Sequence, residues 1–168
     1  MCSLAGVLGR AGPWEGHVEG TLGRLLLGSL AAAIAVVTVH EGIIYGLTQS
    51  GLIRGTAWGM QPIPPWGVPR LLNSIFWGGL WGALFAAVYD RLPGHAPWVK
   101  GLVYGLLIVV FSNWLLLPLI KGQVLGQPNQ VLFAGWHPGR MAAVVMIVGG
   151  FGVALGVIYG LLRLRSPA

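Results

Sequence analysis

The sequence predicts an all-α integral membrane protein in which four transmembrane helices form a bundle. Its 168 residues are 55% hydrophobic and only 8% charged, and the mean hydropathy is +0.77. A soluble domain of this length needs more charge to cover its surface. The apolar residues come in long blocks, and the 28 glycines suit helices that approach one another closely in lipid.

A transmembrane helix needs about 20 mostly apolar residues, and four stretches qualify: residues 25–47, 71–89, 99–120 and 141–162. We expect residues 1–24 to form a polar arm, with part of it an interfacial helix around Trp14, and residues 25–168 to form the transmembrane domain. The link 61–69 contains four prolines and cannot be helical, because proline lacks an amide donor. The short link 90–97 predicts that the second and third helices are antiparallel neighbours.

A weak internal repeat appears at an offset of 70 residues. The matching pairs are Trp66 and Trp136, Arg70 and Arg140, Gly79 and Gly149, Gly82 and Gly152, Tyr89 and Tyr159, and Leu92 and Leu162. This pattern favours a tandem repeat of two helical hairpins. Since each unit would contain two helices, the pseudo-twofold axis would lie along the membrane normal.

The basic residues predict the orientation of the chain. The side that holds both termini would carry Arg10, Arg24, Arg91, Lys100, Arg163 and Arg165, and the opposite side Arg54, Arg70, Lys121 and Arg140. The positive-inside rule therefore places both termini in the cytoplasm. These cations stand singly at helix ends instead of forming one patch, which argues against nucleic acid as a partner.

The strongest polar anomaly is the pair His40-Glu41 inside the first helix. A charge at the bilayer centre costs at least about 2.5–3.5 kcal/mol, so such residues indicate function by default. Tyr45 lies one turn from Glu41 on the same helix face, and Ser112 and Asn113 of the third helix fall near the same depth.

We therefore predict one polar layer in the outer half of the membrane, made by His40, Glu41, Tyr45, Ser112 and Asn113. Glu41 would accept hydrogen bonds from Asn113 or His40. The backbones of Gly78-Gly79 and Gly149-Gly150 would lie beside the layer, and Pro118 would free a carbonyl near Trp114.

This layer has two interpretations, both open from sequence. It is either a proton relay, an ion or substrate site or a cofactor ligand, or else a hydrogen-bonded cluster that holds helices or subunits together. His40 could ligate the metal of a haem or chlorin, with His137 as a second ligand. No residue spacing matches a metal site, and the sequence requires no cofactor.

Glycines recur along the helices at spacings that allow close helix packing: Gly78, Gly82, Gly149, Gly152, Gly156 and Gly160. They would serve contacts within the bundle or a face that meets another protein. Asp90-Arg91, at the end of the second helix, is interpreted as a solvated ion pair.

Several stretches resemble a family of small uncharacterised bacterial inner-membrane proteins with four helices. They are Trp81-Gly-Ala-Leu-Phe-Ala-Ala-Val-Tyr-Asp-Arg-Leu-Pro-Gly94, Trp98-Val-Lys-Gly-Leu-Val-Tyr-Gly-Leu106, Pro118-Leu119 and Val157-Ile-Tyr-Gly-Leu-Leu162. The resemblance spans about residues 70–162 and implies the fold and a bacterial inner membrane. It implies no activity, and the first helix with His40-Glu41 departs from the family pattern.

No catalytic motif is visible among the four acidic residues, so we expect no enzyme. The first functional hypothesis is a non-enzymatic accessory or structural subunit that packs against a larger membrane complex and contacts pigment, quinone or lipid. The alternative is a small homo-oligomeric transporter or channel that uses Glu41 and His40. The expected partners are the lipid bilayer and either another membrane protein or further copies of the chain.

Overall fold

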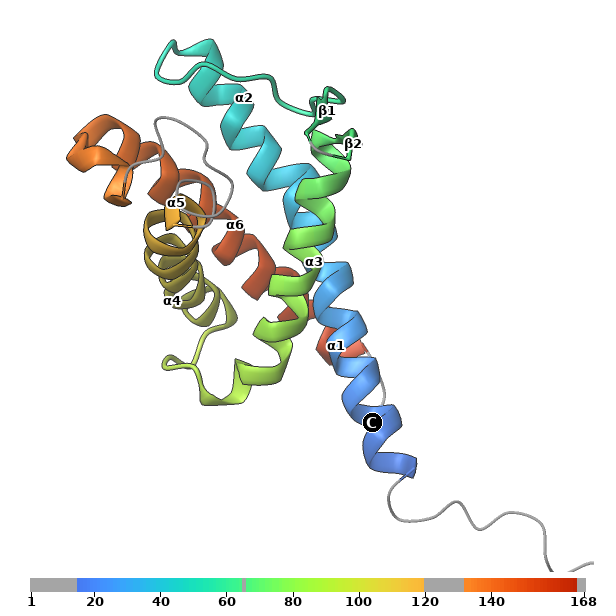
Figure 1. Ribbon diagram of the computed structural model, residues 1–168. Helices are drawn as coiled ribbons and strands as arrows, with labels where there is room; N and C mark the ends of the chain where they lie inside the picture. The colour runs from blue at the N-terminus through green and yellow to red at the C-terminus, as the bar shows by residue number, and fades with distance from the viewer. Residues whose placement is uncertain (1–14, 65, 120–131, 166–168) are drawn as a thin grey trace, which may run out of the picture.

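The computed structural model describes residues 15–64, 66–119 and 132–165, and most of them are helical (Figure 1). The elements in chain order are α1 (Glu15–Ala35), a π-helix (Val36–His40), α2 (Glu41–Gln49), β1 (Pro62–Ile63), β2 (Val68–Pro69), α3 (Arg70–Val88), a 3-10 turn (Tyr89–Arg91), α4 (Pro97–Ile108), a second π-helix (Val109–Leu116), α5 (Leu117–Leu119), a 3-10 helix (Leu132–Trp136) and α6 (Pro138–Arg165). The two short strands pair antiparallel.

The prediction of four helices long and apolar enough to cross a membrane is confirmed. These continuous helices are Gly20–Gln49, Arg70–Arg91, Pro97–Leu119 and Pro138–Leu164. Helix α1 already begins at Glu15, so residues 15–24 of the expected arm continue the first helix, because no proline interrupts it before Gln49. Trp14 and the remainder of the arm lie outside the described residues, as do Ile120 and Lys121.

Local chemistry accounts for the helix ends. Helix α2 stops where Gly51 adopts a left-handed backbone with φ of 73°, a conformation that glycine adopts without steric cost. Helices α4 and α6 begin with Pro97 and Pro138. Proline suits this position because the first helical amides have no partner within the helix.

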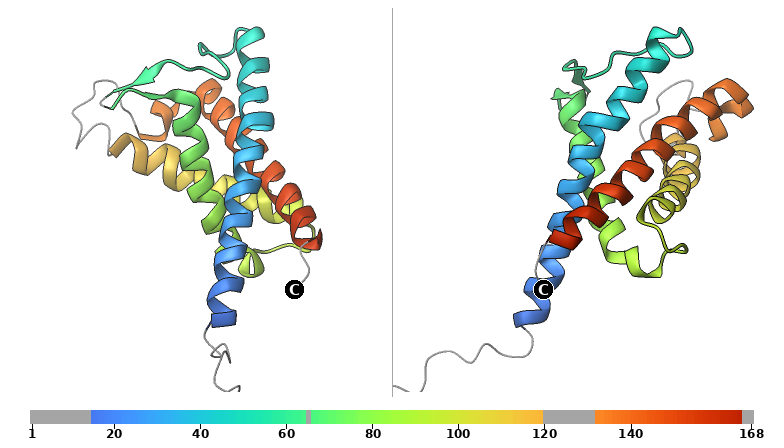
Figure 2. Two further views of the ribbon diagram at one scale, coloured as in Figure 1. Left: turned by 90° about the vertical axis from the view of Figure 1, so that its right-hand side faces the viewer. Right: turned by 180° about the vertical axis from the view of Figure 1, so that it is seen from behind.

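The helices associate as two close pairs. A side chain at Gly28 would clash with the Gly82 carbonyl, which brings α1 against α3. A side chain at Gly101 would likewise clash with the Gly152 carbonyl, which brings α4 against α6. Helix α1 also packs on α6, and the two pairs are inclined to each other (Figure 2).

Helices α3 and α4, expected to be antiparallel neighbours, meet through aromatic side chains and not through close backbones. The Tyr104 hydroxyl donates a hydrogen bond to the Trp81 carbonyl at 2.8 Å, and the Tyr104 and Phe85 rings lie 5.1 Å apart. Large rings keep these backbones apart, whereas the glycine faces let each helix approach its partner within its own pair. Phe85 also contacts Tyr159, which joins the two pairs in an aromatic core.

Candidate functional site

Glu41 is the one buried charged side chain among the described residues, with only 1% of its surface exposed. It follows the π-helical turn Val36–His40, where the helix widens. The amide of Glu41 donates to the carbonyls of Val36 and Thr38, while an α-helix would direct it to Val37. Such π-turns often occur at functional sites, and here the turn leaves the Val37 carbonyl available to another donor.

One hydrogen-bond donor and two ion-pair partners surround the Glu41 carboxylate. The backbone amide of Trp58 donates to Oε2 at 2.7 Å. His40 Nδ1 lies 3.3 Å and Arg70 Nη2 lies 3.5 Å from Oε1, both ion-pair separations. A buried carboxylate needs such partners, because removal from water penalises the charged form heavily.

Trp58 connects the loop to the π-turn through two groups. Its amide binds Glu41, and its indole Nε1 donates to the Val37 carbonyl at 2.9 Å. Its backbone adopts φ of 50°, a left-handed conformation that is uncommon for a residue other than glycine. Trp58 thus ties the loop between α2 and α3 to the helix through both its backbone and its side chain.

Sequence reasoning found Glu41 and His40 but missed two of their partners. Trp58 carries no charge that would single it out, and Arg70 entered only as a charge that sets orientation. Arg70 is half-buried, also donates to the Thr56 carbonyl, and approaches Glu41 from the start of α3. The remaining signal in the sequence was the placement of Arg70 directly after the proline-rich link.

The other predicted members of the polar layer lie apart from this network. Tyr45 is exposed and its ring lies 5.9 Å from the Trp58 ring. Ser112 is buried and Asn113 half-buried in the second π-helix. No hydrogen bond links Asn113 to Glu41 in the part of the chain that the structure describes. The hydrogen bond to Glu41 comes from the α2–α3 loop, and Arg70 and His40 are its ion-pair partners.

The predicted packing glycines lie at contacts between helices. Gly82 faces Gly28, Gly152 faces Gly101 and Gly105, and Gly156 and Gly160 face Pro97. Gly78 lies against the Val36 side chain, and the Cα of Gly149 lies opposite Gly105. Gly150 faces Ile43 and Val39 beside the site, so a glycine backbone does accompany α2 at this level.

A second polar cluster lies at the opposite end of the helices. Asp90 pairs with Arg24 at 2.7 Å and with Arg163 at 2.8 Å, so the interpretation of Asp90-Arg91 as an ion pair is wrong. Lys100 donates to the Tyr89 carbonyl and lies over the Tyr89 ring. The tertiary fold brings these cations together from α1, α4 and α6.

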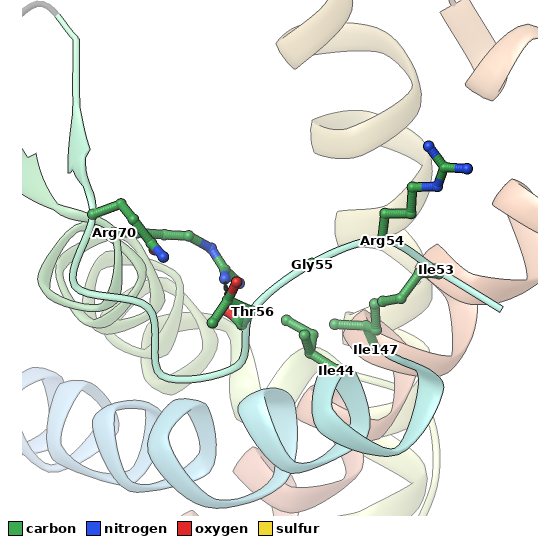
Figure 3. A pocket seen from close by; sticks show the side chains of 8 residues that line it. Ile44, Ile53, Arg54, Gly55, Thr56, Arg70 and Ile147 are labelled. Atoms are coloured by element: carbon green, nitrogen blue, oxygen red, sulfur yellow. Dashed lines mark hydrogen bonds between the residues drawn. The ribbon is translucent and has the colours of Figure 1, made fainter. Parts of the chain in front are cut away.

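An open pocket of about 350 Å³ lies next to the Glu41 network. Its lining combines isoleucines with polar loop residues: Ile44, Ile53, Arg54, Gly55, Thr56, Gln61, Arg70 and Ile147. Figure 3 shows Arg70 turned toward Thr56, Arg54 projecting to the other side of the loop, and Ile44 and Ile147 close together between α2 and α6.

Within the described ranges, no three His, Cys, Asp or Glu side chains converge on a common metal position. His40 contacts Glu41 on one side and the Phe151 ring edge-to-face at 6.3 Å on another. Comparison of the chain with protein families, with curated proteins and with solved structures gave no match. Any function must therefore be argued from the geometry.

Proposed function

We propose that the chain is a non-enzymatic integral membrane protein that packs against a larger membrane complex as an accessory or structural subunit. The observation that carries this proposal is the low burial of the four spans. Only 22–33% of the most apolar window of each span is buried inside the molecule. Most residues of these windows therefore keep some surface for lipid or for other subunits.

Helix α1 presents the surface best suited to a partner helix. Large apolar side chains are exposed on it and on the π-turn that follows, at spacings of three or four residues: Leu22, Leu26, Leu30, Ile34 and Val37. This spacing forms a stripe on one helix face. The first turns of α1 also extend beyond the other helices (Figures 1 and 2). Such a stripe would accept a partner helix, a pigment, a quinone or a lipid chain.

The Glu41 network supports a structural role. Its carboxylate contacts Trp58, His40 and Arg70, so its charge joins the loop to α2 and α3. A transport site needs a group that exchanges partners with a solute. A carboxylate with three protein partners suits a bundle that keeps one shape beside a larger complex.

The location and orientation belong to the same proposal. We place the chain in a bacterial inner membrane with both termini in the cytoplasm. Of the described cations, Arg24, Arg91, Lys100 and Arg163 lie at the end where the ion pairs of Asp90 join α1 to α6. Three lie at the other end: Arg54, Arg70 and Arg140. The excess agrees with the positive-inside rule.

The tandem repeat also gains support from burial. The buried positions Gly28, Ala31, Ala32, Ala35 and Val36 correspond at an offset of 73 residues to Gly101, Tyr104, Gly105, Ile108 and Val109, which are all buried. In the second helix of each pair, Gly82, Phe85, Ala86 and Tyr89 correspond at an offset of 70 to Gly152, Leu155, Gly156 and Tyr159, again all buried. Both π-helices begin at corresponding positions, Val36 and Val109.

The test is purification of the tagged chain from its native membrane in mild detergent, followed by mass spectrometry and an absorption spectrum. We expect other membrane subunits in fixed stoichiometry. Replacing Leu26 and Leu30 together by Ala should release them, while replacing the exposed Leu80 and Leu84 of α3 should not. A colourless homo-oligomer without other subunits contradicts the proposal.

The second candidate is a homo-oligomeric transporter or channel that uses Glu41 and His40. It is favoured by the burial of this ionisable pair beside an open pocket. Glu41→Gln separates the two candidates, since glutamine still accepts the Trp58 hydrogen bond but carries no charge. Loss of solute flux in proteoliposomes with intact assembly supports transport, and unchanged partner binding without any flux in the wild type supports the accessory role.

A further inference from the structure

We infer that the pocket between the α2–α3 loop, α2 and α6 binds a phosphate group that carries an apolar chain, as the headgroup of an anionic phospholipid does. The pocket combines two arginines, Arg54 and Arg70, with three isoleucines. This inference rests on the proposed membrane location of the chain but is independent of any partner subunit.

The polar half of the pocket has unused capacity to bind an anion. Arg70 donates to Thr56 and approaches Glu41, which leaves other donors of its five N–H groups for a ligand. Arg54 is exposed and has no hydrogen-bond or ion-pair partner among the described residues. Guanidinium groups match the geometry of phosphate oxygens, and two of them can hold one phosphate from both sides.

The local charge favours an anion. Glu41 is the acidic group within ion-pair distance of Arg70, and it is shared with His40. The two arginines therefore keep a net positive charge beside the pocket. Arg54 turns away from Arg70 in Figure 3, and an exposed side chain can rotate toward a ligand on a picosecond to nanosecond timescale.

The apolar half sets the class of ligand. Ile44 and Ile147 come from different helices and, with Ile53 of the loop, form a hydrocarbon wall below the arginines. A free inorganic anion would make no use of this wall. A phospholipid would place its phosphate between the arginines and the start of an acyl chain along the isoleucines, at the end of the helices where headgroups lie in the proposed orientation.

The experiment is a native mass spectrometry titration of the full chain in mild detergent with phosphatidylglycerol, with phosphatidylcholine and with inorganic phosphate. We expect the wild type to bind phosphatidylglycerol at least tenfold more tightly than phosphatidylcholine. Arg54→Ala should remove this preference. Arg140→Ala is the matched control, because Arg140 is an exposed arginine at the same end of the helices that does not line the pocket.

Two further arms identify the source of the phosphate and test the wall. If inorganic phosphate binds, Arg54→Ala abolishes this binding and the lipids do not bind, the ligand is a free anion. If phosphatidylglycerol binds and inorganic phosphate does not, the ligand is a lipid headgroup. Ile147→Gln should weaken lipid binding several-fold without affecting inorganic phosphate. Equal binding of both lipids together with no phosphate binding, or equal losses in Arg54→Ala and Arg140→Ala, would overturn the inference. Failure to find partner subunits would not affect it.

Discussion

The two helix pairs share a packing pattern, but in each an aromatic residue contacts the widened helix by different chemistry. In the first pair, the residue that follows the five-residue π-turn is Glu41, and at the same offset of 73 residues the second pair has Trp114. Each contacts an aromatic residue with a left-handed backbone, Trp58 in the α2–α3 loop and Phe133 in the 3-10 helix Leu132–Trp136. Trp58 with φ of 50° donates to Glu41, and the ring of Phe133, also with φ of 50°, lies 5.9 Å from that of Trp114.

The comparison distinguishes the small residues that both helix pairs need from the buried carboxylate that the first pair has in addition. Both pairs need small residues where the helices cross, and both have them. Among the described residues, a buried charge at this contact occurs in the first pair alone, together with Arg70 and the pocket beside it. In the second pair the corresponding contact joins two rings, Trp114 and Phe133, so the carboxylate of the first pair adds a charge that specifies one position of the α2–α3 loop.

The largest effect is expected from Glu41→Leu. This change leaves the amide of Trp58 and the charge of Arg70 without the buried carboxylate, which should lower the free energy of unfolding by about 3 kcal/mol. The measurement is unfolding in mixed micelles followed by far-ultraviolet circular dichroism. Trp114→Leu at the corresponding position should cost less, because it removes only ring contacts. Equal losses in the two variants would show that the carboxylate has no special role.

A smaller effect of about 2 kcal/mol is expected from Gly101→Ala, because the new methyl group meets the backbone of α6 at Gly152 and Gly156. Gly82→Ala should behave alike in the first pair, where it meets Gly28 and Ala32. Gly46→Ala is the control, since no atom lies within 4 Å of its Cβ position, and it should be neutral or slightly stabilising. A harmless Gly101→Ala would disprove the close approach.

Trp58→Phe should cost about 1 kcal/mol, because it removes the indole donor to the Val37 carbonyl and keeps the amide bond to Glu41. The readout is hydrogen exchange of the α2–α3 loop amides, which should accelerate. Trp66→Phe, at a side chain that is 87% exposed, serves as the control. Unchanged exchange in Trp58→Phe would mean that the loop is held by other contacts.

The smallest effect is expected from Asp90→Asn. This change removes the ion pairs of Asp90 with Arg24 on α1 and with Arg163 on α6, and so a connection between the two helix pairs. Both ion pairs are largely exposed, so the loss in free energy of unfolding should be about 0.5–1 kcal/mol at low salt. It should shrink at 1 M salt, where charges are screened within about 3 Å. Arg91→Ala is the control, and a loss that does not depend on salt would argue against an electrostatic connection.

The amino-acid sequence carries the large features of this fold because they depend on composition along single helices. Four apolar blocks of sufficient length form four helices, and prolines at 69, 97 and 138 lie at the starts of the last three. The continuation of the first helix back to Glu15 is not evident from the sequence, because residues 15–24 are polar, but no proline there interrupts the helix. Polar residues near a membrane surface do not end a helix by themselves.

The candidate site shows the opposite case. Glu41 and His40 stood out in the sequence because their charge is rare in an apolar block. Their partners could not be found in this way, since Trp58 and Arg70 are ordinary residues for a loop and a helix start. Equal depth in the membrane predicted Asn113 as the partner of Glu41, but the loop folds back over α2 and Trp58 donates there instead.

By itself, the sequence determined how many apolar helices form, where small residues allow them to meet, and which charge must be buried. Only the tertiary structure decided which helices pair, that Asp90 joins α1 to α6, and that Arg70 reaches Glu41 across 29 positions of the chain. The physical reason is the distance along the chain over which each interaction acts. Helix formation and hydropathy act between neighbours in the chain, whereas a buried carboxylate takes its donors from whichever segment the packed helices bring within about 3 Å.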